Sequence, residues 1–171
     1  VGRRQLKNRA LAYLADGDPA EGAALALAQF EGADNMTDAQ AALAVLVHLD
    51  GDERGAALQR FYAKWQTNPL VIDKWFALQA GSRRSDTLAA VKALAGHGDF
   101  NPKNPNRVRA LLGSFGHNQV HFHRADGAGY EFYPYWILRL DRINPQPAAG
   151  LAAAFTPWKR FDGGRQKLMA A

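Results

Sequence analysis

An asparagine or aspartate followed directly by a proline recurs along the chain. Such a pair is typical of a helix start, because the polar side chain caps free backbone N–H groups and proline fits the first helical position. The pairs are Asp18-Pro19, Asn68-Pro69, Asn104-Pro105 and Asn144-Pro145. Thr37-Asp38-Ala39-Gln40 adds a start of the capping-box type. These signals divide the chain into segments of helical length.

Apolar residues between these starts recur at helical spacing. Leu58, Phe61, Tyr62 and Trp65 occupy positions i, i+3, i+4 and i+7, which form one stripe on an α-helix. The spacing recurs twice further along the chain, and no run alternates apolar and polar residues with the period of a strand. We therefore predict helices near residues 3–15, 19–31, 37–50, 53–67, 69–80, 85–95, 105–115, 129–143, 145–155 and 160–170.

The links between the predicted helices are short, so consecutive helices are expected to pack antiparallel. This predicts an all-α fold, a superhelical array of about ten antiparallel-packed helices of the α-solenoid or HEAT-like kind, with a closed bundle as the alternative. The one long irregular stretch, residues 116–128, is rich in histidine and glycine. We expect an ordered surface loop there.

Composition narrows the class of protein. The 171 residues are 47% hydrophobic, which suffices for a single helical domain over residues 1–171. The net charge of +5 permits an anionic partner, but the basic residues are dispersed, as on a solvated surface. No apolar run approaches the roughly 18 residues of a membrane span. The absence of cysteine excludes disulfides and thiolate metal ligands and is compatible with a reducing compartment. We expect a cytoplasmic protein.

Three histidines in the irregular stretch form the most metal-like pattern of the sequence. His117, His121 and His123 lie close together, with Asp126 nearby. Imidazole nitrogens suit the tetrahedral shell of zinc, so a shared ion is one interpretation. A glycine-bounded loop does not assure the helical spacing of such ligands, and a polar loop with one or two hydrogen-bonded histidines is the simpler alternative. We therefore predict no metal site in this chain.

Recognisable catalytic motifs are absent. No histidine is followed by glutamate, so the zinc motif H-E-x-x-H does not occur, and neither a P-loop, a G-x-G-x-x-G nor a G-x-S-x-G is present. Without a cysteine or a serine motif, covalent catalysis has no candidate nucleophile. We expect no catalytic residue and no cofactor within these residues.

Arg107 and Arg109 are two residues apart on a predicted helix, so they point about 200° apart around its axis and flank its apolar stripe. In the commoner outcome, both lay their stems along the core edge and keep their charged heads in water. In the functional alternative, one guanidinium faces an enclosed space and offers its donors to a carboxylate. Two interpretations also remain for the aromatic segments near residues 65–76 and 130–136. Core packing is the commoner one at helical spacing, and platforms on which a ligand stacks are the alternative.

Short runs spread along nearly the whole chain resemble those of a known family. They are Asn35-Met36-Thr37-Asp38, the segment from Lys64 to Gln79, Asn104-Pro105-Asn106-Arg107-Val108-Arg109, Asp126 to Tyr130, Asn144-Pro145-Gln146, and Lys159 to Gln166. Through this ordered series the chain resembles the C-terminal domain of bacterial aminopeptidase N, of the zinc-dependent gluzincin aminopeptidases.

The resemblance implies a superhelical α-domain that caps a thermolysin-like catalytic domain and closes a chamber, which admits small peptides and excludes folded proteins. The zinc would belong to the catalytic domain. The expected partners are the enzyme's own N-terminal and catalytic domains and peptide substrates, with neither nucleic acid nor a membrane. Because the chain begins at Val1 inside a helical pattern, without a methionine, we interpret it as a C-terminal fragment of a larger aminopeptidase. The family implies a further helix after Ala171.

Two candidate site residues follow from the resemblance. Arg109, the second arginine of the Asn-Pro-Asn-Arg-x-Arg run, resembles a residue facing the chamber, and Gln146 resembles a second lining residue. Close relatives carry an arginine nearby where this chain has Gly150, and His123 matches a histidine of a loop without metal. The leading hypothesis is a non-catalytic, chamber-forming module of a zinc aminopeptidase that removes N-terminal residues from peptides. The alternatives are a helical-repeat module that binds nucleic acid through a basic face and a protein-interaction scaffold.

Overall fold

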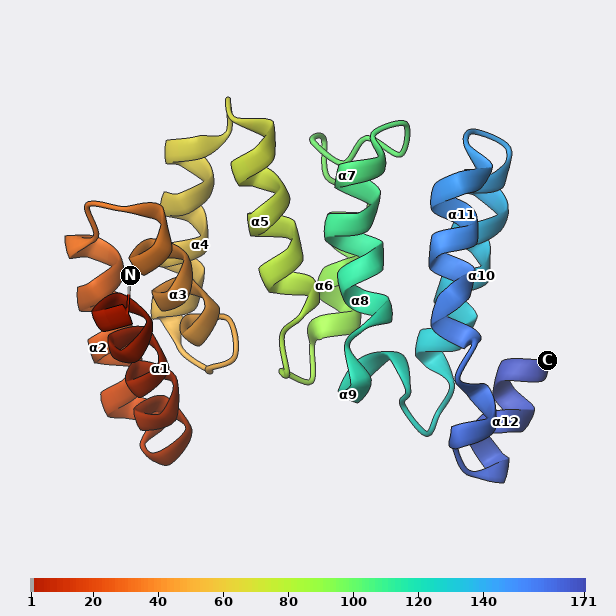
Figure 1. Ribbon diagram of the computed structural model, residues 1–171, viewed down its shortest axis with the longest axis horizontal. Coiled ribbons are helices and arrows are strands. Elements are labelled where there is room, and N and C mark those ends of the chain that lie inside the picture. The colour runs from red at the N-terminus through yellow and green to blue at the C-terminus, as the bar shows by residue number, and fades with distance from the viewer. Residues whose placement is uncertain (1) are drawn as a thin grey trace. The chain divides into compact units, whose positions relative to one another are not determined.

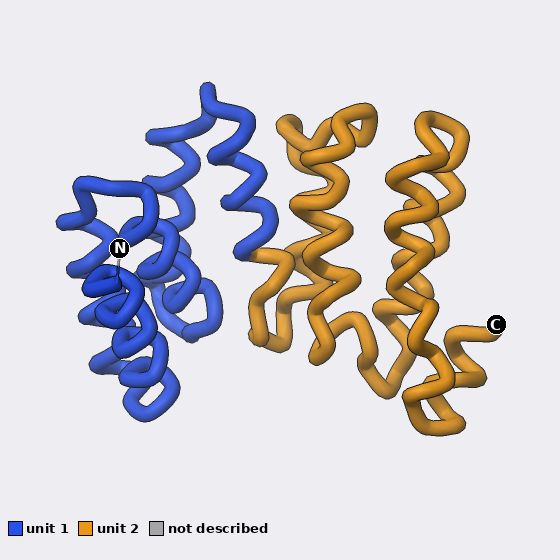
Figure 2. Tube along the Cα trace, viewed as in Figure 1, with its two compact units in different colours: residues 1–78 blue, residues 79–171 orange. Residues whose placement is uncertain are grey.

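The computed structural model describes residues 2–171, and every regular element in that range is helical (Figure 1). The chain divides into two compact units, residues 1–78 and 79–171 (Figure 2). The first contains α1 (Gly2–Gly17), α2 (Pro19–Gly32), α3 (Met36–Leu46), α4 (Asp52–Trp65) and most of α5 (Pro69–Ala80). The second contains α6 (Thr87–Leu94), α7 (Pro105–Val108), η1 (Arg109–Gly113), α8 (Ser114–Gly116), α9 (Gln119–Phe122), α10 (Ala128–Asp141), α11 (Pro145–Ala152), η2 (Ala153–Phe155), η3 (Trp158–Arg160) and α12 (Gly163–Ala170).

The four helix starts predicted at Asp-Pro and Asn-Pro pairs are confirmed in atomic detail. The start predicted at Thr37 is wrong, because α3 begins at Met36 and the Asn35 side chain caps it by accepting from the Asp38 N–H at 3.0 Å. Asp18 Oδ1 accepts hydrogen bonds from two backbone N–H groups of α2, at 3.0 and 3.1 Å. Asn104 caps α7 in the same way, and Asn144 caps α11. Each of these helices has proline in its first turn. The caps are local features, which explains why sequence alone reveals them.

The first unit is built from helices that approach one another closely. α1 contacts α2 and α3, and α2 also contacts α3 and α4. Gly22 marks the tightest approach, because a Cβ added there would lie 2.3 Å from the Cα of Ala15 in α1. Alanines fill much of the remaining interior, and Ala26, Ala42 and Ala57 are completely buried. Small side chains at these positions let the helix backbones come together.

The second unit has an aromatic core. The Phe122 ring centroid lies 5.9 Å from that of Phe115 and 4.8 Å from that of Tyr133, both in T-shaped geometry. The Tyr133 hydroxyl donates to the carbonyl of Leu112 at 2.8 Å. Burial raises the pKa of Tyr133 well above its ordinary range, so this phenol stays protonated and remains a donor.

Residues 105–116 form one continuous helical run in which the middle turn, η1, is a π-helix. A π-helical turn is wider than an α-helical one and is frequent at functional sites. Side chains supply partners to its carbonyl groups, since Leu112 receives the Tyr133 hydroxyl and the Gly113 oxygen lies 2.7 Å from His117 Nδ1. The apolar stripe predicted for this segment is buried, with Leu111 and Leu112 fully enclosed.

The segment 116–128 differs from the predicted surface loop. It contains α9, and His121 and His123 within it are 4% and 5% exposed. The Asn118 carboxamide donates to the backbone carbonyls of residues 80 and 82, at 3.0 and 2.7 Å. The prediction was wrong because these partners lie far away in sequence, where local composition carries no information about them. Elsewhere the observed helix ends differ from the predicted ones by a few residues. For example, the helix predicted to reach residue 50 ends at Leu46.

Candidate functional site

Arg109 begins the π-helical turn and is exposed. Its Nη2 donates to Asn106 Oδ1 at 2.6 Å, and its Nε donates to the carbonyl of Pro105 at 3.3 Å. These two contacts hold the guanidinium beside the preceding helical turn. Within residues 2–171 its Nη1 makes no hydrogen bond. A guanidinium oriented in this way still has donors to offer to a carboxylate.

Arg107 occupies a different environment from Arg109. Its side chain is buried, with the residue 5% exposed, and its Nη1 donates to the backbone carbonyl of Asp99. The expectation that both arginines keep their heads in water is therefore wrong for Arg107. Burial is possible because the loop before α7 folds back and presents a carbonyl to the guanidinium. Of the two, only Arg109 is available to a ligand in this chain.

Gln146 is the second residue of α11 and is exposed. Its backbone N–H is taken by the Asn144 cap at 3.1 Å, whereas its side-chain carboxamide has no partner within the described range. Gly150 lies one helical turn further on, and a Cβ added there would meet no heavy atom within 4 Å. The face of α11 that carries Gln146 and Gly150 is therefore open.

The second unit contains both residues, and their elements touch, since α11 packs against η1. Arg109 offers positively charged hydrogen-bond donors, and Gln146 offers an uncharged donor and an uncharged acceptor. A site for peptide carboxylates and peptide amides requires groups of these kinds. Their role as lining residues stays a prediction.

The three histidines of the suggested metal pattern lie in three separate environments. His117 is exposed with its Nδ1 next to the Gly113 carbonyl, and both ring nitrogens of buried His121 lack a hydrogen-bond partner. His123 Nδ1 lies 2.8 Å from the Tyr130 hydroxyl. Burial, and secondarily the charge of Arg165, lower the pKa of His123. In the described part of the chain, no three His, Cys, Asp or Glu side chains are grouped to hold a metal ion.

Asp126, the fourth member of the pattern, is paired with an arginine. Arg124 Nη2 lies 2.6 Å from Asp126 Oδ2, and the backbone N–H of Ala128 donates to Oδ1 at 3.1 Å. The hydrogen bond from Arg124 is the main reason that the pKa of Asp126 falls to about 2. The carboxylate therefore stabilises the turn into α10 rather than joining the histidines.

This helical architecture is that of a known protein family. The family model described as a domain of unknown function (DUF3458_C) with ARM repeats matches residues 1–171. The chain belongs to that family. ARM repeats are stacked helical repeats, so membership of the DUF3458_C family confirms the prediction of an all-α helical array.

Relatives of this DUF3458_C domain confirm the resemblance to aminopeptidase N. The chain is 42% identical over 172 residues to aminopeptidase N of Caulobacter vibrioides, and 41% identical over 172 residues to aminopeptidase N of Escherichia coli. In both cases the alignment covers 100% of this chain and 20% of the relative. The chain thus spans about a fifth of the length of these relatives and is homologous to their C-terminal part.

A solved structure supports the same conclusion. The crystal structure of Legionella pneumophila aminopeptidase A in complex with aspartic acid matches with a TM-score of 0.91 and 39% identity. The match covers 97% of this chain and 20% of that one. The two share both fold and ancestry over this region. Within residues 2–171, no helix is both long enough and apolar enough to span a membrane.

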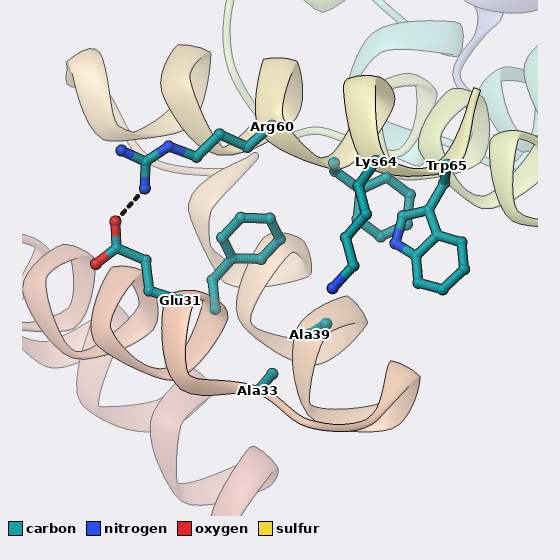
Figure 3. A pocket seen from close by; sticks show the side chains of 8 residues that line it. Glu31, Ala33, Ala39, Arg60, Lys64 and Trp65 are labelled. Atoms are coloured by element: carbon teal, nitrogen blue, oxygen red, sulfur yellow. Dashed lines mark hydrogen bonds and ion pairs between the residues drawn. The ribbon is translucent and has the colours of Figure 1, made fainter.

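One concave feature of the first unit was not predicted from the sequence. Trp65, which the spacing assigned to the core, is half-buried and forms part of the lining of a cavity of about 280 Å³. Arg60 and Lys64 of α4 and Glu31 of α2 also line it (Figure 3). In the sequence, only the spacing of Arg60 and Lys64, one helical turn apart with Trp65 next to Lys64, indicates this site.

Proposed function

We propose that residues 1–171 form the non-catalytic C-terminal module of an aminopeptidase that removes N-terminal residues from peptides. The module would enclose the chamber in which the peptide is cleaved and so restrict entry to small peptides. One observation carries this proposal: the whole chain aligns with a fifth of aminopeptidase N at 41–42% identity. The hydrolytic zinc would be supplied by the catalytic domain of the parent protein. Its partners would be the enzyme's other domains and peptide substrates, in the cytoplasm.

Arg109 and Gln146 are the proposed lining residues. Arg109 carries a positive charge and presents an unused N–H donor, which suits the carboxylate of a peptide. The exposed Gln146 carboxamide suits peptide amide groups. Neither residue performs a chemical step; both would orient the part of the peptide that lies beyond the cleaved bond.

The isolated chain provides the first test. We expect purified residues 1–171 to retain no stoichiometric zinc after dialysis and to hydrolyse no aminoacyl-arylamide, because the described residues contain no grouped metal ligands. Metal content is measured by atomic absorption and turnover by release of the arylamine. Turnover by the rigorously purified chain would contradict the proposal.

The full-length protein provides the second test. Arg109→Ala should raise KM for tripeptides and tetrapeptides by roughly tenfold, since charge-assisted hydrogen bonds contribute about 1.5–3 kcal/mol. Hydrolysis of a single-residue arylamide should be almost unaffected, because that substrate lacks the distal carboxylate. Arg160→Ala, which removes an exposed arginine of η3, is the matched control. Equal losses on both substrates would exclude a role of Arg109 in contacting the far end of peptides.

A further inference from the structure

The cavity of the first unit lies between α2, the start of α3, and α4. Its lining combines Phe30 and Phe61 with the small residues Ala33 and Ala39, and with Trp65. Phe61 is 1% exposed, so it belongs to the core, and the Phe30 ring centroid lies 6.5 Å from it. With a volume of about 280 Å³, the cavity is close to the lower end of small-molecule sites.

Charged groups stand at the edge of this apolar space. The guanidinium of Arg60 is paired with Glu31, as Figure 3 shows. Lys64 extends into the cavity from the same helix, one turn further on. Two positive groups against one negative group leave the lining with an excess of positive charge, and such a lining favours an anion.

Of the two basic residues that line the cavity, Lys64 is the one without an acidic partner in the described part of the chain. Its Nζ lies 5.5 Å from the Trp65 ring centroid, over the ring, and forms neither an ion pair nor a hydrogen bond within residues 2–171. The cation–π contact keeps the ammonium group near the cavity rather than extended into solvent. All three donors of the ammonium group therefore remain available to an incoming acceptor.

We propose that this cavity binds a small organic acid whose apolar body, aromatic or branched aliphatic, carries one carboxylate. The apolar body would enter between Phe30, Phe61 and Ala39, and the carboxylate would pair with Lys64. Arg60 contributes a second positive charge, while Glu31 competes with the ligand for it. The site is independent of the proposed aminopeptidase function, because its recognition groups include neither Arg109 nor Gln146.

The probe for this site is 3-phenylpropanoate, with 3-phenylpropanamide as its uncharged counterpart. We expect the acid to bind the chain saturably with a Kd on the order of 1 mM, a value normal for so small a ligand. The indole N–H resonance of Trp65, assigned through Trp65→Phe, should shift in a two-dimensional NMR titration. The amide should bind at least about threefold more weakly. The tripeptide Gly-Gly-Phe tests whether the same acid is accepted at the end of a peptide.

Two substitutions should change the affinity in opposite directions. Lys64→Met keeps the aliphatic stem, removes the charge, and should weaken binding of the acid about three- to tenfold. Glu31→Gln removes the competing carboxylate and releases Arg60, so it should strengthen binding about two- to fivefold. A substitution that merely disturbed the fold would weaken binding in both variants.

Lys159→Met is the matched control for Lys64→Met. Lys159 is also adjacent to a tryptophan in sequence, with its Nζ 5.7 Å from the Trp158 ring centroid, but it does not line this cavity. Its loss should leave the affinity unchanged. No saturable binding of the acid or the tripeptide at about ten times the expected Kd would overturn the proposal. Equal affinity of acid and amide would do the same, as would equal effects of the Lys64 and Lys159 substitutions.

Discussion

Lys7 Nζ donates to Asp38 Oδ2 at 2.7 Å and thereby joins α1 to α3. Asn8 Nδ2 donates to the other oxygen of the same carboxylate at 3.0 Å, and Asn35 contributes a third side-chain donor. Asp38 is only 7% exposed. The hydrogen bond from Lys7 is the main reason that the pKa of Asp38 falls to about 2, although burial acts in the opposite direction. A largely buried carboxylate is thus fully partnered by groups from two other segments.

Asp38→Asn should destabilise the first unit. The substitution keeps the shape of the side chain but removes the charge that holds Lys7, and it replaces an acceptor oxygen with a donor facing other donors. We expect the midpoint of thermal unfolding, followed by circular dichroism at about pH 7, to fall by roughly 5 °C. Asp141→Asn is the control, because Asp141 is an exposed carboxylate at the end of α10. An Asp38→Asn chain as stable as the Asp141→Asn chain would refute the role of this network.

The same carboxylate predicts an acid-dependent loss of stability. The pKa of Asp38 is lowered in the folded chain, so its contribution is fully present above the ordinary value of 3.8. That contribution is lost as the pH falls towards about 2, where the folded carboxylate itself takes up a proton. Because Asp126 and Asp162 also have lowered pKa values, the informative quantity is the difference between the wild-type and Asp38→Asn chains. This difference in unfolding midpoint should shrink between about pH 5 and pH 2.

Gly22 should be intolerant of even one methyl group. A Cβ at this position would lie 2.3 Å from the Cα of Ala15, so α1 and α2 would have to separate. We expect Gly22→Ala to lower the free energy of unfolding by about 1–3 kcal/mol, the usual cost of overpacking. Urea denaturation measures this change. Gly55→Ala in α4, where the added atom meets nothing within 4 Å, should instead be neutral or stabilising by up to about 1 kcal/mol. Equal effects of the two substitutions would contradict the close approach.

The features that the sequence predicted are those that depend on neighbouring residues. The Asp18 and Asn104 caps are local and form as expected, and the apolar stripe beginning at Leu58 buries Leu58 and Phe61. The burial of Arg107 depends on a carbonyl eight residues away, and the burial of Asn118 on carbonyls 36 and 38 residues away. Neither spacing nor composition encodes such contacts. The candidate Arg109 came from the family resemblance alone, and the cavity at Lys64 depends on where α2 and α4 meet.

His123 should titrate below the ordinary histidine value. Its ring stacks on that of Phe161, with the two ring centroids 4.0 Å apart, and its Nδ1 lies next to the Tyr130 hydroxyl. Arg165 places a positive charge nearby. Burial, followed by the Arg165 charge, lowers the pKa of His123 below 6.5. The folded chain therefore favours the neutral ring, and the associated stability is present above 6.5 and declines as the pH falls below it.

NMR titration of the imidazole carbon-bound protons tests this directly, with an expected midpoint below 6.5. In His123→Gln, the decline of unfolding free energy between about pH 7 and pH 5 should be shallower, by up to about 1.4 kcal/mol per pH unit. His117→Gln, the same substitution at an exposed histidine, is the control, and an equally shallow decline in both variants would contradict the specific role of His123. A His123 midpoint at or above 6.5 would contradict the effect of burial.

Gly150→Arg tests whether the open face of α11 belongs to a peptide site. The structure has room for the side chain, since nothing lies within 4 Å of an added Cβ. Replacing glycine by arginine in a helix should stabilise the chain by about 0.5–1 kcal/mol, because arginine loses less backbone entropy on folding. In the full-length protein, the new charge would lie one turn from Gln146 and should lower KM for tripeptides by about two- to fivefold, an effect that salt weakens. Gly55→Arg adds the same charge to an equally open helical position of the first unit, so it should reproduce the gain in stability and leave KM unchanged. A lower KM in both variants would mean that net charge attracts the peptide and that α11 has no special part in binding it.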